Sequence, residues 1–166
     1  MNQQQLVMLA EQVGELFRVN GQKLATAESC TGGWVAQCLT AIPGSSRWFD
    51  RGFVTYSNAA KQEMLGVSAT TLETQGAVSE ATAAEMALGA LRYSQSDWSL
   101  AITGIAGPDG GNADKPVGTV FFAWAGSDGQ LATARHNLNG SRANIRAQSV
   151  AIALRGIIDR AELMQA

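Results

Sequence analysis

The chain has 166 residues, of which 46% are hydrophobic and 16% are charged. It is therefore long enough to bury one core and too hydrophobic to be disordered. Its net charge of -2 at pH 7, with both signs mixed along the sequence, argues against a protein that holds a nucleic-acid backbone. No segment reaches the roughly 18 apolar residues of a membrane span, and the first residues lack the basic region of a signal peptide. We expect a single domain over residues 1–166, with no nucleic-acid or membrane partner.

Hydrophobic spacing predicts a helix and then a strand–loop–helix unit at the start of the chain. Apolar residues recur at helical spacing from Leu6 to Leu16 and predict a helix over about residues 3–19. The period then changes, so residues 23–27 are predicted to form a short strand. The loop ESCTGG at 28–33 is expected to open a second helix.

The same alternation continues through the middle of the chain. A second strand is predicted at residues 51–56, and Asn58 is expected to cap a helix that carries Lys61. Ser79 is predicted to cap an alanine-rich helix over about residues 80–93.

The last part of the chain adds strands and a final helix. A strand at residues 98–103 ends in the glycine-rich loop TGIAGPDGG at 103–111. Residues 117–126 and 130–138 are predicted to form an antiparallel hairpin, and Ser141 to cap the last helix. The expected fold class is α/β, with three α/β/α layers and a mixed, mostly parallel sheet.

Ser29 is a candidate nucleophile because it lies where a strand meets a helix. At such a junction the main-chain N–H groups of Thr31, Gly32 and Gly33 can face a negative charge. A hydroxyl that attacks an amide needs donors of this kind for the developing oxyanion. The alternative is that Ser29 only caps the helix.

Lys61 is a candidate general base. It is predicted in the first turn of its helix, where the macrodipole disfavours a cation and, with partial burial, lowers the amine pKa. The alternative is a solvated surface lysine. Tyr56, at the end of the preceding strand, could hydrogen-bond to the same site, although a tyrosine at a core margin is common.

The glycine-rich loop at 103–111 allows a backbone to approach a ligand closely and to present N–H donors. Its spacing matches neither the Walker nor the dinucleotide fingerprint, so a tight surface loop remains the alternative. The candidate substrate-binding residues in it are Thr103, Gly104, Ile105, Ala106 and Gly107.

Four other residues are weighed for the site. Arg142 and Arg146, one helical turn apart, could clamp a phosphate, although solvated arginines at this spacing are common. Cys30 is a rival nucleophile, but cysteine is often a small buried hydrophobe. The single histidine, His136, is expected to be structural. The presence of only one histidine and two cysteines argues against a closed zinc site.

Five segments together resemble the CinA C-terminal domain family. They occur in the family's order and span nearly the whole chain: TAESCTGG at 26–33, GFVTYSNAAK at 52–61, GAVSE at 76–80, TGIAGPDGG at 103–111 and KPVGTVFFA at 115–123. The resemblance implies hydrolysis of nicotinamide mononucleotide to nicotinate mononucleotide and ammonia, within pyridine nucleotide recycling. It also implies a homodimer.

The resemblance places the family's nucleophile on Ser29 and its active-site lysine on Lys61, and it matches Tyr56 and Thr103 to pocket residues. The family often has Gly-Asp-Arg where this chain has Gly140-Ser141-Arg142, so a role for an acidic side chain there is not carried over. The arginine at position 142 remains a candidate for the phosphate.

The hypothesis from the sequence is that neutral Lys61 takes the proton of Ser29 as its oxygen attacks the carboxamide, without a metal or organic cofactor. Two alternatives stay open: a non-catalytic nucleotide-binding module, and a cysteine-dependent hydrolase that uses Cys30. The two cysteines are predicted in an unfavourable geometry for a disulfide, which favours reduced thiols and a cytoplasmic protein.

Overall fold

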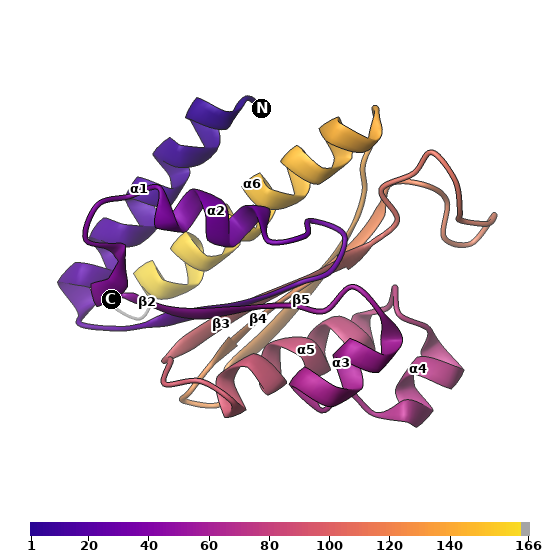
Figure 1. The fold of residues 1–166 in the computed structure, drawn as a ribbon, viewed down its shortest axis with the longest axis horizontal. Helices are drawn as coiled ribbons and strands as arrows, with labels where there is room; N and C mark the ends of the chain where they lie inside the picture. Colours follow the sequence, from indigo (N-terminus) through magenta and orange to yellow (C-terminus); the bar gives the residue numbers. More distant parts are fainter. Residues whose placement is uncertain (164–166) are drawn as a thin grey trace.

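The structure is a computed structural model that describes residues 1–163 and consists of three layers (Figure 1). Helices α1, α2 and α6 cover one face of the sheet, and α3, α4 and α5 cover the other. The elements are α1 Gln3–Asn20, β1 Leu24–Glu28, α2 Trp34–Thr40, the 3₁₀ turn η1 Ser45–Arg47, β2 Phe49–Val54, α3 Asn58–Leu65, α4 Ala69–Gln75, α5 Glu80–Arg92, β3 Trp98–Gly104, β4 Thr119–Gly126, β5 Leu131–Asn137 and α6 Arg142–Leu163.

The sheet is mixed and has the order β2-β1-β3-β4-β5. Strand β1 is parallel to β2 and β3, whereas β4 is antiparallel to β3 and β5. Four of the five strands in the described part of the chain therefore run in one direction, and the expected fold class and hairpin are confirmed. The register pairs Glu28 with Val54 and Ile102, so three parallel strands end at one edge, where ligands bind in open α/β sheets.

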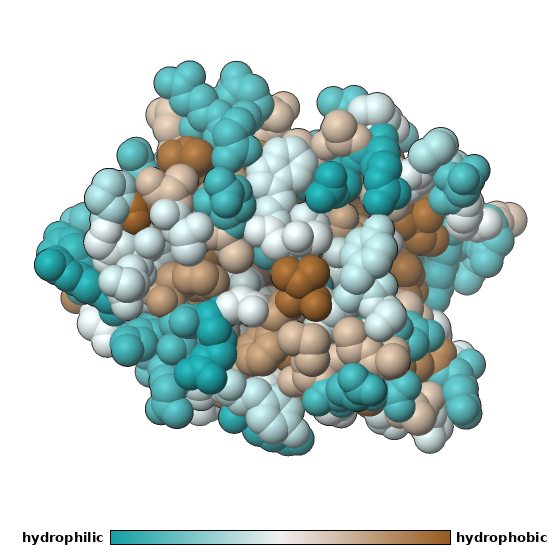
Figure 2. Space-filling view, in the orientation of Figure 1, coloured by the Kyte–Doolittle hydropathy of each residue, from teal (hydrophilic) through white to brown (hydrophobic). Residues whose placement is uncertain are grey.

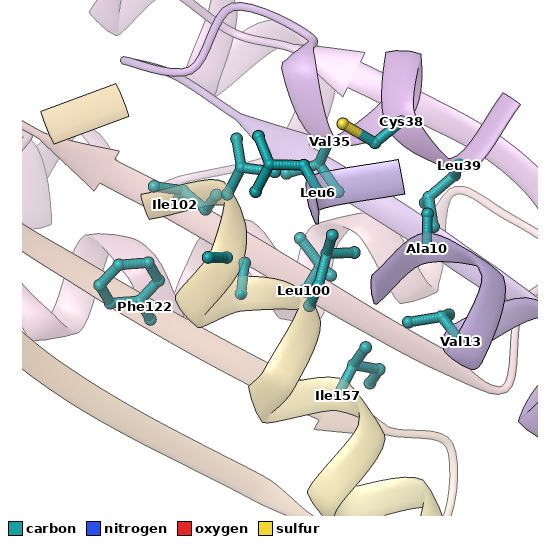
Figure 3. Close-up of a cluster of buried hydrophobic side chains, with 14 of the residues drawn as sticks. Leu6, Ala10, Val13, Val35, Cys38, Leu39, Leu100, Ile102, Phe122 and Ile157 are labelled. Atoms are coloured by element: carbon teal, nitrogen blue, oxygen red, sulfur yellow. The ribbon is translucent and has the colours of Figure 1, made fainter. Parts of the chain in front are cut away.

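The larger hydrophobic core lies between the sheet and the layer of α1, α2 and α6. Figure 3 shows Leu100 and Ile102 of β3 facing side chains of these helices, among them Leu6 and Ile157. Each of these side chains is fully buried, and burial of one such side chain contributes about 1.5–3 kcal/mol. Because β3 is covered on both faces, its residues from Trp98 to Thr103 are all buried, without alternation of buried and exposed positions.

The opposite face of the sheet presents small side chains to α5. Ala25, Ala101 and Ala123 are fully buried there, which lets the helix lie close to the strands. A Cβ added to Gly89 of α5 would lie only 2.0 Å from the main-chain oxygen of Leu65. The absence of a side chain at Gly89 therefore allows α3, the helix that carries the candidate base, to pack closely against α5.

Three details differ from the sequence prediction. Ser57, not Asn58, caps α3, since its extended backbone lets its hydroxyl accept a hydrogen bond from the Ala60 N–H at 3.0 Å. Strand β2 runs over Phe49–Val54 and not over residues 51–56, so Tyr56 lies beyond its end. Helix α4 was not predicted, because its seven residues are mostly polar and too few to show a hydrophobic period.

Hydrophilic and hydrophobic side chains are interspersed on the face of the molecule shown in Figure 2. Among the described residues, no helix combines the length and the hydrophobicity that a membrane span requires. Both cysteines are buried free thiols, as expected.

Candidate active site

A cavity of about 290 Å³ opens at the carboxyl ends of the parallel strands. The loop after β1, the start of α3, the segment between α4 and α5, and the loop after β3 all contribute to its wall. Its lining residues are Ser29, Cys30, Tyr56, Asn58, Lys61, Ala77, Val78, Thr103, Gly104, Ile105, Ala106, Gly107, Asp109 and Arg142. The structure thus brings most of the predicted site residues to one place.

Ser29 and Lys61 are in direct contact at the base of this cavity. The Nζ atom of Lys61 lies 3.0 Å from Oγ of Ser29. It also donates a hydrogen bond of 2.8 Å to the main-chain oxygen of Thr55. Lys61 is only 2% exposed and Ser29 9%, so the pair is held in a fixed geometry and shielded from bulk water.

Burial changes the acid–base chemistry of Lys61. Loss of hydration disfavours the charged ammonium and lowers the pKa of the amine below its ordinary value of 10.5. Within residues 1–163 the lysine forms no ion pair that would restore the pKa. A neutral amine next to a hydroxyl can accept its proton.

The main-chain N–H groups at the start of α2 are occupied by a side chain of the protein itself. The carboxylate of Glu28 accepts hydrogen bonds from the N–H groups of Val35 at 2.9 Å and Ala36 at 3.1 Å. It also accepts one from Oγ1 of Thr31 at 2.7 Å. Burial raises the pKa of this carboxyl group, whose residue is 1% exposed, while these donors oppose the shift. Sequence reasoning overlooked Glu28, although its position directly before Ser29 was a signal.

The glycine loop after β1 therefore differs from the sequence prediction. Thr31, Gly32 and Gly33 do not line the cavity, and the Gly32 N–H donates to the Ser29 carbonyl at 3.0 Å. Gly33, at a φ of 101°, is the N-cap of α2. The alternative that Ser29 caps this helix is consequently wrong, and its hydroxyl instead accepts the hydrogen bond from Lys61.

Other main-chain donors lie at the cavity wall. In the part of the chain that the structure describes, the N–H groups of Cys30, Ala106 and Gly107 have no oxygen acceptor. The Ile105 N–H, in contrast, is bonded to the Thr119 carbonyl at 2.9 Å. Gly107 adopts a φ of 78°, a conformation that glycine reaches without strain.

Arg142 joins two walls of the cavity. Its guanidinium donates hydrogen bonds of 2.8 Å to the Gly107 carbonyl and 3.0 Å to the Tyr56 hydroxyl. Arg146 lies elsewhere: it donates to the carbonyls of Cys30 at 3.0 Å and Thr31 at 3.1 Å. Arg142 thus faces the cavity, whereas Arg146 fixes the loop behind Ser29.

Gly104 and Thr103 have structural reasons for their identity. A Cβ on Gly104, at the end of β3, would lie 2.7 Å from Cγ2 of Val120 in the neighbouring strand β4. The pairing of the two strands therefore requires glycine at position 104. The Thr103 hydroxyl donates to the Ala77 carbonyl at 2.8 Å. Asn58 and Asp109 lie in segments expected near the ligand but were not singled out as lining residues. The sequence did not predict a place in the wall for Ala77 and Val78, although GAVSE at 76–80 was among the recognised segments.

The remaining candidates have simpler explanations. Cys30 lines the cavity, but burial raises the pKa of its thiol to about 11, which disfavours the nucleophilic thiolate. His136 lies in β5 and packs edge-on against Phe122, with the two ring centroids 5.4 Å apart. Among residues 1–163, no group of three or more His, Cys, Asp or Glu side chains could hold a metal ion.

The chain resembles known proteins over nearly its whole length. A family model described as the CinA C-terminal domain matches residues 6–161. Nicotinamide-nucleotide amidohydrolase PncC of Escherichia coli strain K12 is 53% identical over 154 residues, which make up 93% of each chain. The protein of the same name from Pseudomonas putida is 43% identical over 153 residues, 92% of this chain and 95% of its own. The crystal structure of competence/damage inducible protein CihA from Agrobacterium tumefaciens has a TM-score of 0.91 at 46% identity, and covers 93% of this chain and 94% of that chain.

Proposed function

Because this chain belongs to the CinA C-terminal domain family, we propose that it is a nicotinamide-nucleotide amidohydrolase that converts nicotinamide mononucleotide to nicotinate mononucleotide and ammonia. The similarity to the amidohydrolases of Escherichia coli and Pseudomonas putida, which covers more than nine-tenths of each chain, supports this activity. The observation that carries the chemistry is the 3.0 Å contact between Nζ of Lys61 and Oγ of Ser29 inside the cavity.

In the proposed reaction, neutral Lys61 takes the hydroxyl proton of Ser29 while Oγ attacks the carboxamide carbon. The tetrahedral intermediate collapses, the lysine returns the proton to the leaving nitrogen, and ammonia departs from an acyl ester on Ser29. Water then attacks this ester, with its proton passing to the same amine. The carboxylate product leaves and the serine hydroxyl is restored, so the cycle needs no metal or organic cofactor.

The developing oxyanion requires hydrogen-bond donors that are already oriented. The sequence pointed to the N–H groups of Thr31, Gly32 and Gly33, but these residues lie outside the cavity lining. We propose instead that the Cys30 N–H is one donor, since it directly follows Ser29 and has no oxygen acceptor among the described residues.

We assign the nucleotide phosphate to the part of the cavity that Arg142 lines. Arg142 supports this assignment because its guanidinium lines the cavity beside Tyr56 and Gly107. The N–H groups of Ala106 and Gly107 lack acceptors within residues 1–163 and could donate to phosphate oxygens. Thr103, Gly104 and Ile105 also line the cavity and would form part of the wall that contacts the nucleotide.

Ammonia release from nicotinamide mononucleotide by the purified protein tests the proposed activity directly. We expect turnover by the parent chain and none by Ser29→Ala measured under the same conditions. A parent protein that binds the nucleotide but releases no ammonia would instead support the non-catalytic binding module.

We also propose a cytoplasmic homodimer. The family resemblance implies the dimer, and the free thiols of Cys30 and Cys38 fit a reducing compartment. In the described chain β2 and β5 are the outer strands of the sheet, and Val54 and Leu131 on them are 45% and 46% exposed. Exposed strand edges are usually covered in stable proteins. Light scattering of the purified protein would give the mass and test the dimer.

A further inference from the structure

Side-chain hydrogen bonds hold the segment between α4 and α5 at the cavity wall. Nζ of Lys115 donates to the Gln75 carbonyl at 3.1 Å and to the Val78 carbonyl at 2.6 Å. The Thr103 hydroxyl donates to the Ala77 carbonyl, which lies between them. Lys115 comes from the loop after β3, so it connects two separate walls of the cavity.

The remaining carbonyl of this segment is also occupied. The Gly76 oxygen accepts hydrogen bonds from the hydroxyls of Thr82 at 2.7 Å and Ser79 at 2.9 Å. Four consecutive main-chain carbonyls, at positions 75–78, are therefore each bonded to a side chain. Side-chain donors at every carbonyl fix the orientation of the peptide planes.

The N–H groups of the same segment are in the opposite situation. Ala77 and Val78 line the cavity and are half-buried. Their N–H groups have no acceptor in the part of the chain that the structure describes. Main-chain N–H groups bond to protein, water or a ligand, so these two N–H groups can donate to a molecule bound in the cavity.

We propose that residues 75–79 form a substrate-binding loop whose Ala77 and Val78 N–H groups donate to oxygen atoms of the nucleotide, and that Lys115 is the residue that positions this loop. The proposal rests on the proposed function for the identity of the ligand. Lys115 does not line the cavity, so it acts through the loop and not by touching the substrate. Its ammonium forms no ion pair within residues 1–163, which leaves the two carbonyls as its main hydrogen-bond partners.

Kinetics of Lys115→Met provide the first test. Loss of charged hydrogen bonds to a binding loop should raise the KM for nicotinamide mononucleotide about tenfold, with kcat changed by less than about threefold. Lys115→Arg keeps the charge and several donors and should recover part of the loss. Lys23→Met is the matched control. Lys23 is exposed and lies directly before β1, at the amino ends of the parallel strands, whereas the cavity lies at their carboxyl ends.

Amide hydrogen exchange gives a readout that does not depend on turnover. In Lys115→Met, peptides that contain residues 76–79 should exchange faster than in the parent, while peptides that contain residues 55–61 should not change. Nicotinamide mononucleotide bound to Ser29→Ala should slow the exchange of Ala77 and Val78.

Three results would overturn the proposal: an unchanged KM in Lys115→Met, unchanged exchange at 76–79, or faster exchange spread over all peptides, which indicates a purely structural role. If the parent protein releases no ammonia, the proposed function fails on its own. The exchange measurements then still decide whether Lys115 positions the loop.

Discussion

Nζ of Lys61 lies 3.0 Å from Oγ of Ser29, and the Thr55 carbonyl accepts a second hydrogen bond from the same amine at 2.8 Å. The serine follows β1 and the lysine belongs to α3, and the parallel pairing of β1 with β2 brings these two segments together. The position of the amine is therefore set by main-chain structure. Its protonation state is set by burial.

Replacement of Lys61 by Arg should remove the general base. A guanidinium stays protonated in proteins, so turnover should fall by about 10²–10⁴-fold, the usual contribution of general acid–base catalysis. Ammonia release measures this loss, and Lys61→Met provides a variant that is not larger than lysine. Lys23→Arg, at an exposed position, is the control. Near-normal turnover of both Lys61 variants would show that another group is the base.

The pH dependence of the reaction should follow the Lys61 amine. Because only the neutral amine accepts a proton, kcat/KM should rise with pH through a single group and level off below the ordinary lysine pKa of 10.5. A profile with no rise below this pH would contradict the assignment. The acidic limb should disappear in Lys61→Met, whatever rate remains.

The same lowered pKa predicts a pH-dependent stability. The unfolded chain binds this proton more tightly than the folded protein, so the contribution of Lys61 is fully present above the unfolded pKa and is lost as pH falls toward the lower folded pKa. Urea unfolding over a pH series should therefore show a free energy of unfolding that rises with pH in this window. In Lys61→Met the rise should be smaller.

Replacement of Cys30 by Ala should leave turnover within about threefold of the parent, because a buried thiol with a pKa of about 11 provides almost no thiolate at neutral pH. Alanine also keeps the main-chain N–H that we propose as an oxyanion donor. Ammonia release and the rate of alkylation by iodoacetamide are the two measurements. A loss of turnover comparable to that of Ser29→Ala would favour the cysteine-dependent hydrolase.

Arg142→Met should weaken recognition of the phosphate. We expect kcat/KM for nicotinamide mononucleotide to fall about 10–100-fold, as for loss of a charge-assisted hydrogen bond. Nicotinamide riboside lacks the phosphate, so we expect the parent protein to turn it over slowly and the Arg142→Met substitution to change that rate little. Arg155→Met is the control, since Arg155 is exposed on the same helix. An equal fall for both substrates would place the role of Arg142 in loop positioning.

The sequence predicted most of the fold because its local signals agreed with the tertiary structure. The caps at Ser79 and Ser141, strand β3 and the hairpin of β4 and β5 all occur where their patterns placed them. Helix α4 and the cap at Ser57 were missed, because a short polar helix has no hydrophobic period and adjacent Ser and Asn are both good caps.

For the site, glycine content indicated which loops approach a ligand but not which way their amides point. The sequence could not show that the Glu28 side chain fills the start of α2, since that depends on how far the strand end lies from the helix. Nor could it place Lys115 against the carbonyls of Gln75 and Val78, which are far from it along the chain. Both contacts are long-range consequences of the packed fold.

The decisive prediction concerns Ser29→Ala. Gly33 is the N-cap of α2, and the Ser29 hydroxyl accepts a hydrogen bond from Lys61. Removal of this hydroxyl should therefore cost less than the roughly 1 kcal/mol of a lost helix cap. If Ser29 is the nucleophile, turnover should nevertheless fall by orders of magnitude, because no acyl ester can form.

The binding apparatus should remain intact in Ser29→Ala, so nicotinamide mononucleotide should still stabilise it, by about 2.7 kcal/mol at a ligand concentration of 100 times Kd. Melting temperature with and without the nucleotide, measured alongside ammonia release, separates loss of chemistry from loss of folding or binding. A variant that does not melt later with ligand has lost binding as well, and its inactivity then says nothing about the nucleophile until binding is restored at higher nucleotide concentration. A folded, ligand-stabilised Ser29→Ala protein that releases ammonia at close to the parent rate would rule out the serine mechanism, because the attacking oxygen would then have to come from another group.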